Sequence, residues 1–172
     1  MRLLLIAATL IALPACNQNE PRGDMTAAQV AEELQDMKIE PGQWDATNEI
    51  VEVSAPKMPG ELLKQMVGRK TVVSNCITPE QAAKPSASFL AAQEGSQCRY
   101  QDWAMDGGKM SGAMTCKGDG SPGEVAMTMT GTYGSNAYDL YMVMKTSGLP
   151  GGMSMTVKAK TAGRRTGACT AT

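Results

Sequence analysis

The residues with the most unusual chemistry in this sequence are its fourteen methionines, which contrast with a single phenylalanine. Six of them occupy alternate positions in three neighbouring strand-like segments, so their side chains would share one face of a sheet: Met127, Met129, Met142, Met144, Met153 and Met155. Thioethers are soft ligands that suit Cu(I). They also fill cores as flexible, polarizable side chains, and this interpretation is favoured because no His or nearby free Cys completes a site.

Catalytic chemistry has little support in the sequence. The chain contains no histidine, which removes Ser-His and Cys-His nucleophile systems and the commonest general base. Asp102 and Asp106 are spaced to share one strand face, but this is the expected solvent face, opposite that of Trp103. The Gly-rich turns at 118–120 and 148–152 lack the helix and Lys of a phosphate cradle. We therefore expect no enzymatic activity and no cofactor.

Four cysteines are expected to form two disulfide bonds, because an even number fits an oxidising compartment: Cys76, Cys98, Cys116 and Cys169. Gly107-Gly108 predicts a two-residue hairpin turn, and the register set by this turn points Cys98 and Cys116 to opposite faces. The sequence therefore predicts the pairs Cys76–Cys98 and Cys116–Cys169. A zinc site is disfavoured because the chain has no CxxC spacing and no histidine.

The N-terminus is typical of an exported protein. Arg2 precedes an apolar run, Leu3–Leu13, which is too short to span a bilayer, so we predict a signal peptide over residues 1–15. Leu13-Pro14-Ala15-Cys16 resembles the lipobox of bacterial lipoproteins, which implies cleavage before Cys16 and a lipid on its sulfur. Ordinary secretion with cleavage nearby is the alternative. Asn17, and not Asp, follows this Cys. By resemblance to the sorting rule of enteric bacteria, this favours the outer membrane.

The lipidated Cys and a polar tether are expected to occupy residues 16–25, followed by a single domain over residues 26–172. Thr26-x-x-Gln29 is a capping-box pattern that predicts a short helix to about Lys38, docked on the sheet. The remaining chain alternates strand-like segments and turns at hairpin spacing. This indicates a mainly β fold, with about seven or eight antiparallel strands in a sandwich or open barrel and two or three short helices.

The methionine-rich segments predict their own register. A hairpin about residues 134–137 would place Met127 opposite Met144 and Met129 opposite Met142. A slip of one residue would move every methionine to the other face, so this register is strongly specified.

A second hairpin, about Thr146–Gly151, would place Met144 opposite Met153 and Met142 opposite Met155. Both hairpins together would gather the six methionines on one apolar face.

The charge balance limits the possible partners. Removal of Arg2 with the signal peptide leaves fifteen basic residues against seventeen acidic ones, without a basic stripe, so we expect no nucleic acid partner. The expected partners are the membrane, through the lipid on Cys16, and either an envelope protein or a small apolar ligand. A sheet lined by Met, Tyr and Gly could leave an adaptable pocket for such a ligand.

Several short motifs follow one another along the mature chain: Pro41-Gly42-Gln43-Trp44, Cys76-Ile77-Thr78-Pro79-Glu80, Cys98, Cys116, Gly151-Gly152-Met153-Ser154-Met155 and Gly167-Ala168-Cys169. From about Glu40 to Cys169, their order and spacing resemble the bacterial domain-of-unknown-function family numbered 3617. The resemblance implies an exported or lipid-anchored protein of didermic bacteria, and it brings no activity, ligand or catalytic residue. We therefore expect a lipid-anchored, periplasm-facing envelope protein that acts by non-enzymatic binding, with Cu(I) binding as the alternative.

Overall fold

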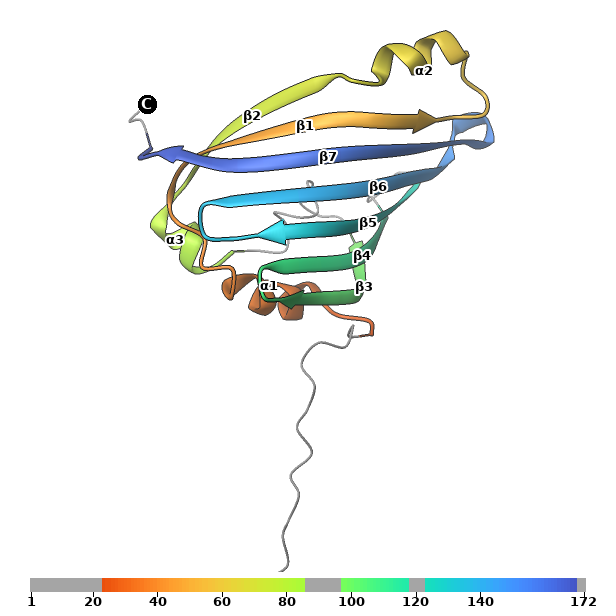
Figure 1. Cartoon of the computed structure of the whole chain (residues 1–172). Coiled ribbons are helices and arrows are strands. Elements are labelled where there is room, and N and C mark those ends of the chain that lie inside the picture. The colour runs from red at the N-terminus through yellow and green to blue at the C-terminus, as the bar shows by residue number, and fades with distance from the viewer. Residues whose placement is uncertain (1–22, 86–96, 118–122, 170–172) are drawn as a thin grey trace, which may run out of the picture.

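The computed structural model describes residues 23–85, 97–117 and 123–169, which form one seven-stranded antiparallel sheet with short helices beside it (Figure 1). The strands are β1 (Gly42–Ser54), β2 (Lys70–Ile77), β3 (Gln97–Asp106), β4 (Lys109–Lys117), β5 (Glu124–Tyr133), β6 (Ala137–Leu149) and β7 (Met153–Gly167). The helices are α1 (Ala27–Gln35), α2 (Gly60–Met66), α3 (Pro79–Ala83) and the 3-10 turn η1 (Pro150–Gly152).

The strand order is β2-β1-β7-β6-β5-β4-β3, so β3 to β7 form a meander and β7 returns beside β1. The sheet curves but does not close, because β2 and β3 remain as its two edges (Figure 1). The predicted mainly β, antiparallel fold is confirmed, as a single open sheet. Within the described residues, no helix is long and apolar enough to cross a membrane.

The pairing of β5 with β6 follows the methionine pattern. Met127 lies opposite Met144 and Met129 lies opposite Met142, as predicted. Side chains alternate between the two faces of each strand, so these methionines share the face that packs against α1, which we call the inner face. The opposite face is called the outer face.

The predicted register between β6 and β7 is wrong by four residues. β6 continues to Leu149, and the chain turns at η1, where Gly151 and Gly152 have φ angles of 73° and 63°. Glycine adopts such angles at little cost, so Gly151 and Gly152 suit the turn at this position. Met144 therefore lies opposite Val157, with Met142 opposite Ala159. Because the shift is even, the inner face of β7 keeps the same residues.

The N-terminal helix begins with the predicted capping box. The Gln29 amide donates to Thr26 Oγ1 at 3.3 Å, and the Thr26 amide donates to Gln29 Oε1 at 2.8 Å. Val30 and Leu34 are fully buried in the inner-face core. The helix thus docks on the sheet as expected, close to β3, and ends at Gln35, three residues earlier than predicted (Figure 1).

The predicted disulfide Cys76–Cys98 is wrong, because β3 contains a bulge. Between Gln101 and Ala104 the β3–β4 register shifts by one residue, and Asp102 takes a φ of 50°. An extra residue in one strand moves every later side chain to the other face. Cys98 therefore lies opposite Cys116 on the same face, at a Cα separation of 4.1 Å, and the two are bonded.

The predicted pair Cys116–Cys169 is wrong for the same reason, and the second bond joins Cys76 to Cys169 with a Cα separation of 5.4 Å. Gln43 in β1 lies between Cys76 of β2 and Gly167 of β7. The last residues of β7 therefore end beside the end of β2. This bond ties the C-terminal segment to an edge strand.

Candidate binding surfaces

The first candidate site is the methionine cluster of the inner face. Met129 is 3% exposed and Met127 is also buried, while their partners Met142 and Met144 are partly buried and pack against the same core. Residues directly opposite in an antiparallel ladder have Cβ atoms about 5 Å apart, within reach of long side chains. Four of the six predicted methionines are thus brought together.

The other two methionines lie away from this cluster. Met155 is opposite Thr146, near the end of β6, and Met153 is 37% exposed beside the η1 turn. Their places are taken by methionines of β4: Met114 lies opposite Met127, and Met110 is buried in the same core. The alternation of Met110, Gly112 and Met114 along β4 is the sequence pattern that indicates this addition.

Trp103 closes the cluster on the β3 side. Its side chain is 1% exposed and lies over Gly112, where a Cβ would overlap the indole ring. Tyr100 meets it edge-on, with ring centroids 6.3 Å apart. The indole Nε1 of Trp103 is buried without a hydrogen-bond partner. The cluster is therefore a closed, soft and aromatic environment that could hold a monovalent soft cation or serve as core.

An apolar ligand pocket was also expected on this face. The cavity that described residues line there, between Met37, Trp44 and Tyr138, has a volume of about 10 Å³. Such a volume holds about one water molecule. Because α1 packs against the same core as the methionines, part of the Met-lined surface is covered by the chain itself.

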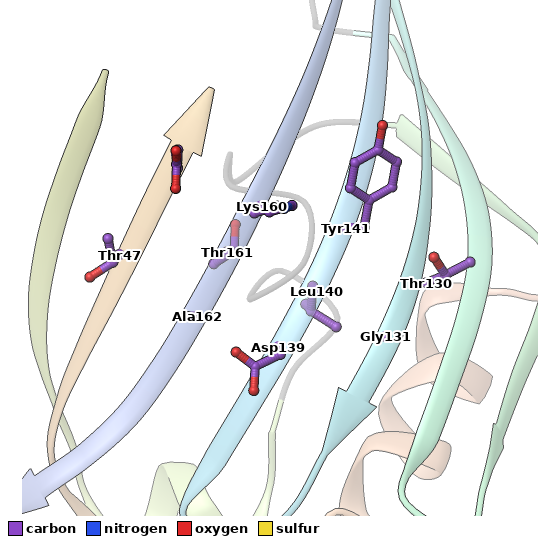
Figure 2. A pocket seen from close by; sticks show the side chains of 10 residues that line it. Thr47, Thr130, Gly131, Asp139, Leu140, Tyr141, Lys160, Thr161 and Ala162 are labelled. Carbon is purple, nitrogen blue, oxygen red and sulfur yellow. The ribbon is translucent and has the colours of Figure 1, made fainter. Parts of the chain in front are cut away.

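The second candidate site is a hollow of about 470 Å³ in the middle of the outer face (Figure 2). Four residues form one row across β1, β7, β6 and β5: Glu49 lies opposite Lys160, Lys160 opposite Tyr141, and Tyr141 opposite Thr130. Ala162, a small side chain, lies in the same hollow and leaves room above the sheet. The row presents an aromatic ring, a cation, a carboxylate and a hydroxyl on a hydrogen-bonded scaffold.

The charges of this row are unequal in their pairing. Glu49 Oε2 lies 3.5 Å from Lys70 Nζ at the sheet edge. The Lys160 side chain makes no hydrogen bond or ion pair within the described part of the chain. Tyr141 is among the few large apolar side chains that are exposed. Lys160 and Tyr141 are therefore the two groups most available to a ligand.

A known family profile covers the whole sheet. The sequence profile of a family described as a protein of unknown function, DUF3617, matches residues 39–169, which include every strand from β1 to β7. The chain belongs to the DUF3617 family. Neither a curated protein nor a solved structure matched the chain.

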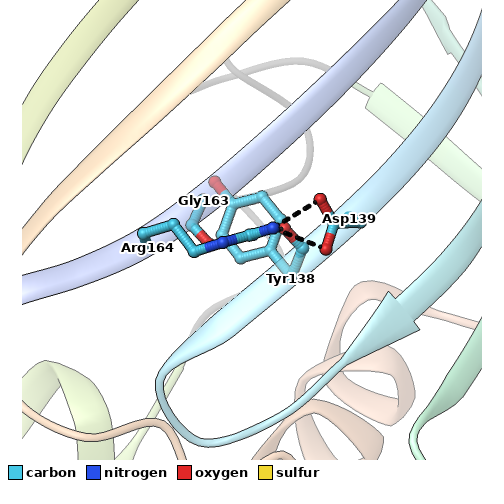
Figure 3. Close-up of polar contacts among 4 residues, drawn as sticks. All are labelled: Tyr138, Asp139, Gly163 and Arg164. Carbon is cyan, nitrogen blue, oxygen red and sulfur yellow. Dashed lines mark hydrogen bonds and ion pairs between the residues drawn. The ribbon is translucent and has the colours of Figure 1, made fainter.

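Beside the hollow, this DUF3617 chain carries a structural polar network (Figure 3). Arg164 donates from Nη2 to both carboxylate oxygens of Asp139 at 2.8 Å, and from Nη1 to the carbonyls of Tyr138 and Gly163 at 2.8 Å. Its donors are thus engaged by the protein, so Arg164 is held as part of the scaffold. Burial raises the pKa of Tyr138, whose ring stacks on Trp44 at 6.1 Å.

The remaining predicted site residue of the DUF3617 chain is Cys16, which lies outside the described residues, as do the signal peptide and most of the tether. The described chain starts at Gly23, within the predicted tether. Met25 forms a bridge to β3, its amide donating to the Tyr100 carbonyl at 2.8 Å. The N-terminal segment therefore reaches the domain at the β3 edge.

Within the described ranges, no group of three or more His, Cys, Asp and Glu side chains gathers where it could hold a metal ion. The outer-face row could not be predicted from the sequence, because its members come from four strands and become neighbours only when β7 lies between β1 and β6. Their outward direction was legible, since Thr130 alternates with Met129 and Tyr141 alternates with Met142. Their adjacency required the topology.

Proposed function

We propose that this protein is an exported lipoprotein, anchored through a lipid on Cys16 and facing the periplasm from the outer membrane, that acts as a non-enzymatic binding module. The anchor is supported by the apolar run of residues 3–13 followed by Ala15-Cys16. The binding role is supported by one observation above the others, the outer-face hollow.

The hollow is suited to binding because its side chains stand on the central strands of a sheet. Binding groups on rigid elements lose little freedom when a ligand arrives. The Tyr141 ring and the small Ala162 offer apolar surface, while Lys160 and Glu49 offer opposite charges at the rim. The ligand that fits is a small molecule with an apolar body and polar groups, or a protruding segment of an envelope protein.

The anchor is tested by changing Cys16→Ser in the full-length chain. We expect the wild-type protein to fractionate with outer membranes and to incorporate labelled palmitate. We expect the variant to lose the label and to appear in the soluble periplasmic fraction. A variant that keeps its label or its membrane association would contradict the anchor at Cys16.

The hollow is tested by native mass spectrometry of the mature full-length protein extracted in mild detergent. We expect the wild type to carry a co-purifying small molecule that Ala162→Phe, which fills the hollow, expels. Ala126→Phe is the matched control, because Ala126 lies on the same outer face of β5 but outside the hollow. An adduct retained by Ala162→Phe would remove the hollow as its binding site, and extracted protein free of any adduct would contradict a small-molecule ligand and leave the envelope-protein segment.

A second candidate function, Cu(I) binding, is favoured by a specific arrangement. Met114, Met127 and Met144 lie in one row across β4, β5 and β6, and Met129 and Met142 lie in the next. Thioethers from adjacent strands are the ligand type that Cu(I) prefers. The burial of the cluster requires that the side chains of α1 yield before a cation enters.

This alternative is tested by Cu(I) competition against a strong chelator, with the disulfides first verified by intact mass. A Cu(I) protein would bind stoichiometrically and lose binding on Met→Leu substitution at 127, 129, 142 and 144. Met153→Leu with Met155→Leu is the matched control, because both residues lie outside the cluster. Absence of binding above background would identify the methionines as core.

A further inference from the structure

The two edges of the sheet are treated differently by the chain. At the β3 edge, the N-terminal segment forms a bridge to Tyr100, and Gln101 Nε2 donates to Asp24 Oδ1 at 2.9 Å. At the other edge, β2 pairs with β1 alone within the described residues, so one side of its backbone has no strand beside it (Figure 1). An unpaired strand edge is a template for another strand.

Apart from Lys70 at its first position, the β2 edge also lacks the usual features that prevent pairing. Seven of its eight residues are exposed, including Val72 at 60% and Val73 at 43%. The stretch Thr71–Cys76 contains no proline and no charged residue, and the β1–β2 register has no bulge. Monomeric proteins protect edge strands with charges, prolines or bulges. The sequence of this edge therefore resembles that of a strand that pairs with another strand on both sides.

The edge is held rigid before any partner arrives. The bond between Cys76 and Cys169 fixes the end of β2 to the C-terminal segment. Ser74 Oγ donates to Asp45 Oδ1 at 2.6 Å, which fixes its middle to β1. A pre-organised strand loses little conformational entropy on pairing. A covalent crosslink thus fixes the strand that is unpaired on one side.

The strand is complementary to itself in the antiparallel sense. A two-fold axis perpendicular to the sheet at Val73 would set Val73 opposite its own copy and Thr71 opposite Asn75 of that copy. Its basic end, at Arg69 and Lys70, would meet the opposite end of the second strand, which has no charged residue before Glu80. Opposed β-branched residues stabilise a strand pair, and like charges are kept apart.

We propose that β2 is the interface of a homodimer, in which two copies of this chain pair their β2 strands antiparallel about a two-fold axis at Val73 and join their sheets into one. A two-fold axis makes each contact reciprocal, so a single self-complementary strand suffices. Leu62 and Val67, which precede the strand in the chain, are exposed as well.

The dimer is compatible with two anchors in one membrane. The N-terminal segment reaches the domain at the β3 edge, and β2 is the far edge. Strands lie about 4.8 Å apart, so the two edges are separated by roughly 29 Å along the sheet. The chain between Cys16 and Met25 can span up to about 30 Å. If each copy is anchored through Cys16, as proposed above, tethers of this length at the two outer β3 edges can reach the same bilayer.

The test uses the full-length chain in its own membrane and a single new cysteine at the axis. Val73→Cys places two thiols opposite each other in the dimer, with Cβ atoms about 4.5–5.5 Å apart, and a small approach of the strands brings them to the roughly 4 Å of a disulfide. We expect a reducible homodimer of twice the monomer mass, with mass spectrometry joining position 73 to position 73. Thr128→Cys, exposed in the middle of the outer face, is the control and should stay monomeric.

A second variant tests the same surface without a crosslink. Val73→Lys brings two ammonium groups together at the axis, and Val73 is exposed, so folding should be preserved and is checked by circular dichroism. We expect the dimer dissociation constant, measured by sedimentation of the extracted protein, to rise at least about tenfold. Thr128→Lys should leave it unchanged.

Three results would overturn the proposal. The wild type could be monomeric at every concentration, with no Val73→Cys dimer in the membrane. The dimer could persist unchanged in Val73→Lys, which would place the interface elsewhere. Val73→Cys could crosslink to a different protein and not to itself, which would assign the edge to a partner's strand.

Discussion

The ring of Tyr138 leaves no room for a side chain at Gly163. A Cβ on Gly163 would overlap the ring atoms of Tyr138, which is stacked on its other neighbour, Trp44. The Trp44 indole Nε1 in turn donates to the Glu40 carbonyl at 3.0 Å, so the stack has little freedom to move aside. The absence of a side chain at this position thus allows the Tyr138 ring of β6 to lie over β7 and stack on Trp44 of β1.

Gly163→Ala is expected to lower the free energy of unfolding by about 1–3 kcal/mol, because an added methyl group in a packed site forces the ring out of place. Gly60→Ala is the matched control: the Cβ would meet nothing within 4 Å at the start of α2. Less backbone freedom in the unfolded chain should make that variant slightly more stable, by about 0.4–1 kcal/mol. Urea unfolding of both variants measures the difference.

A double-mutant cycle identifies the cause. If the overlap with Tyr138 is responsible, the penalty of Gly163→Ala should largely disappear in a Tyr138→Ala background. A penalty that is unchanged in this background would assign the effect to the backbone of β7.

Among the elements, β3 has the largest consequence for the rest of the molecule. Its bulge at Asp102 and Trp103 sets two residues opposite one, which turns Cys98 to the side of Cys116. The bulge also leaves Trp103 on the inner face over Gly112, together with Tyr100. One extra residue therefore determines both the disulfide of this hairpin and the aromatic border of the methionine cluster.

The two disulfides should contribute unequally to stability. Cys98–Cys116 closes a sequence separation of 18 residues and Cys76–Cys169 one of 93. In the loop-entropy model these contribute about 3 and about 4.5 kcal/mol. Replacing both members of the second pair by Ala should therefore lower the urea midpoint more than replacing both members of the first.

Non-reducing peptide mapping checks the pairs behind this prediction. Removal of Cys76 and Cys169 should leave the Cys98–Cys116 peptide intact, because the two bonds lie in different parts of the sheet. A peptide that joins Cys76 to Cys98, or equal destabilisation by both double substitutions, would contradict the assignment.

At the scale of the whole molecule, the two faces and the two edges of the sheet differ in what lies on them. The inner face carries the methionine core and α1, while the outer face carries the hollow with Lys160 and Tyr141. The β3 edge receives the N-terminal segment, and the β2 edge is open within the described chain. The proposed anchor, ligand and second copy would therefore use separate places on one sheet.

The pH dependence of folding should reflect the buried tyrosines. Burial raises the pKa of Tyr100 and Tyr138 above 10.0, and burial with the nearby Asp106 raises the pKa of Tyr133. A group with a higher pKa in the folded state binds its proton more tightly there. Its contribution to stability is complete below the unfolded pKa and is lost as the pH rises through the folded pKa.

We therefore expect the free energy of unfolding to be nearly constant between about pH 6 and 8, where no histidine titrates, and to fall above about pH 10. Urea unfolding followed by far-UV circular dichroism at each pH measures it. Tyr138→Phe, which cannot ionise, should lose less stability above pH 10 than the wild type. A marked decrease between pH 6 and 8 would show that another group controls the stability.

The sequence by itself determined the local features of this protein. The capping box at Thr26, the Gly107-Gly108 turn and the pairing of Met129 with Met142 follow from neighbouring residues and the two-residue period of a strand. The antiparallel, mainly β fold follows from the same rhythm. These features depend on contacts between residues close in the chain.

Only the tertiary structure decided which distant segments meet. The bulge in β3 reversed the side on which Cys98 lies, and this changed both disulfide pairs. The insertion of β7 between β1 and β6 created the outer-face row and left β2 at an edge. A one-residue irregularity or a strand order changes no local pattern, yet it redirects every contact made across the sheet, because the side-chain period of a strand is two.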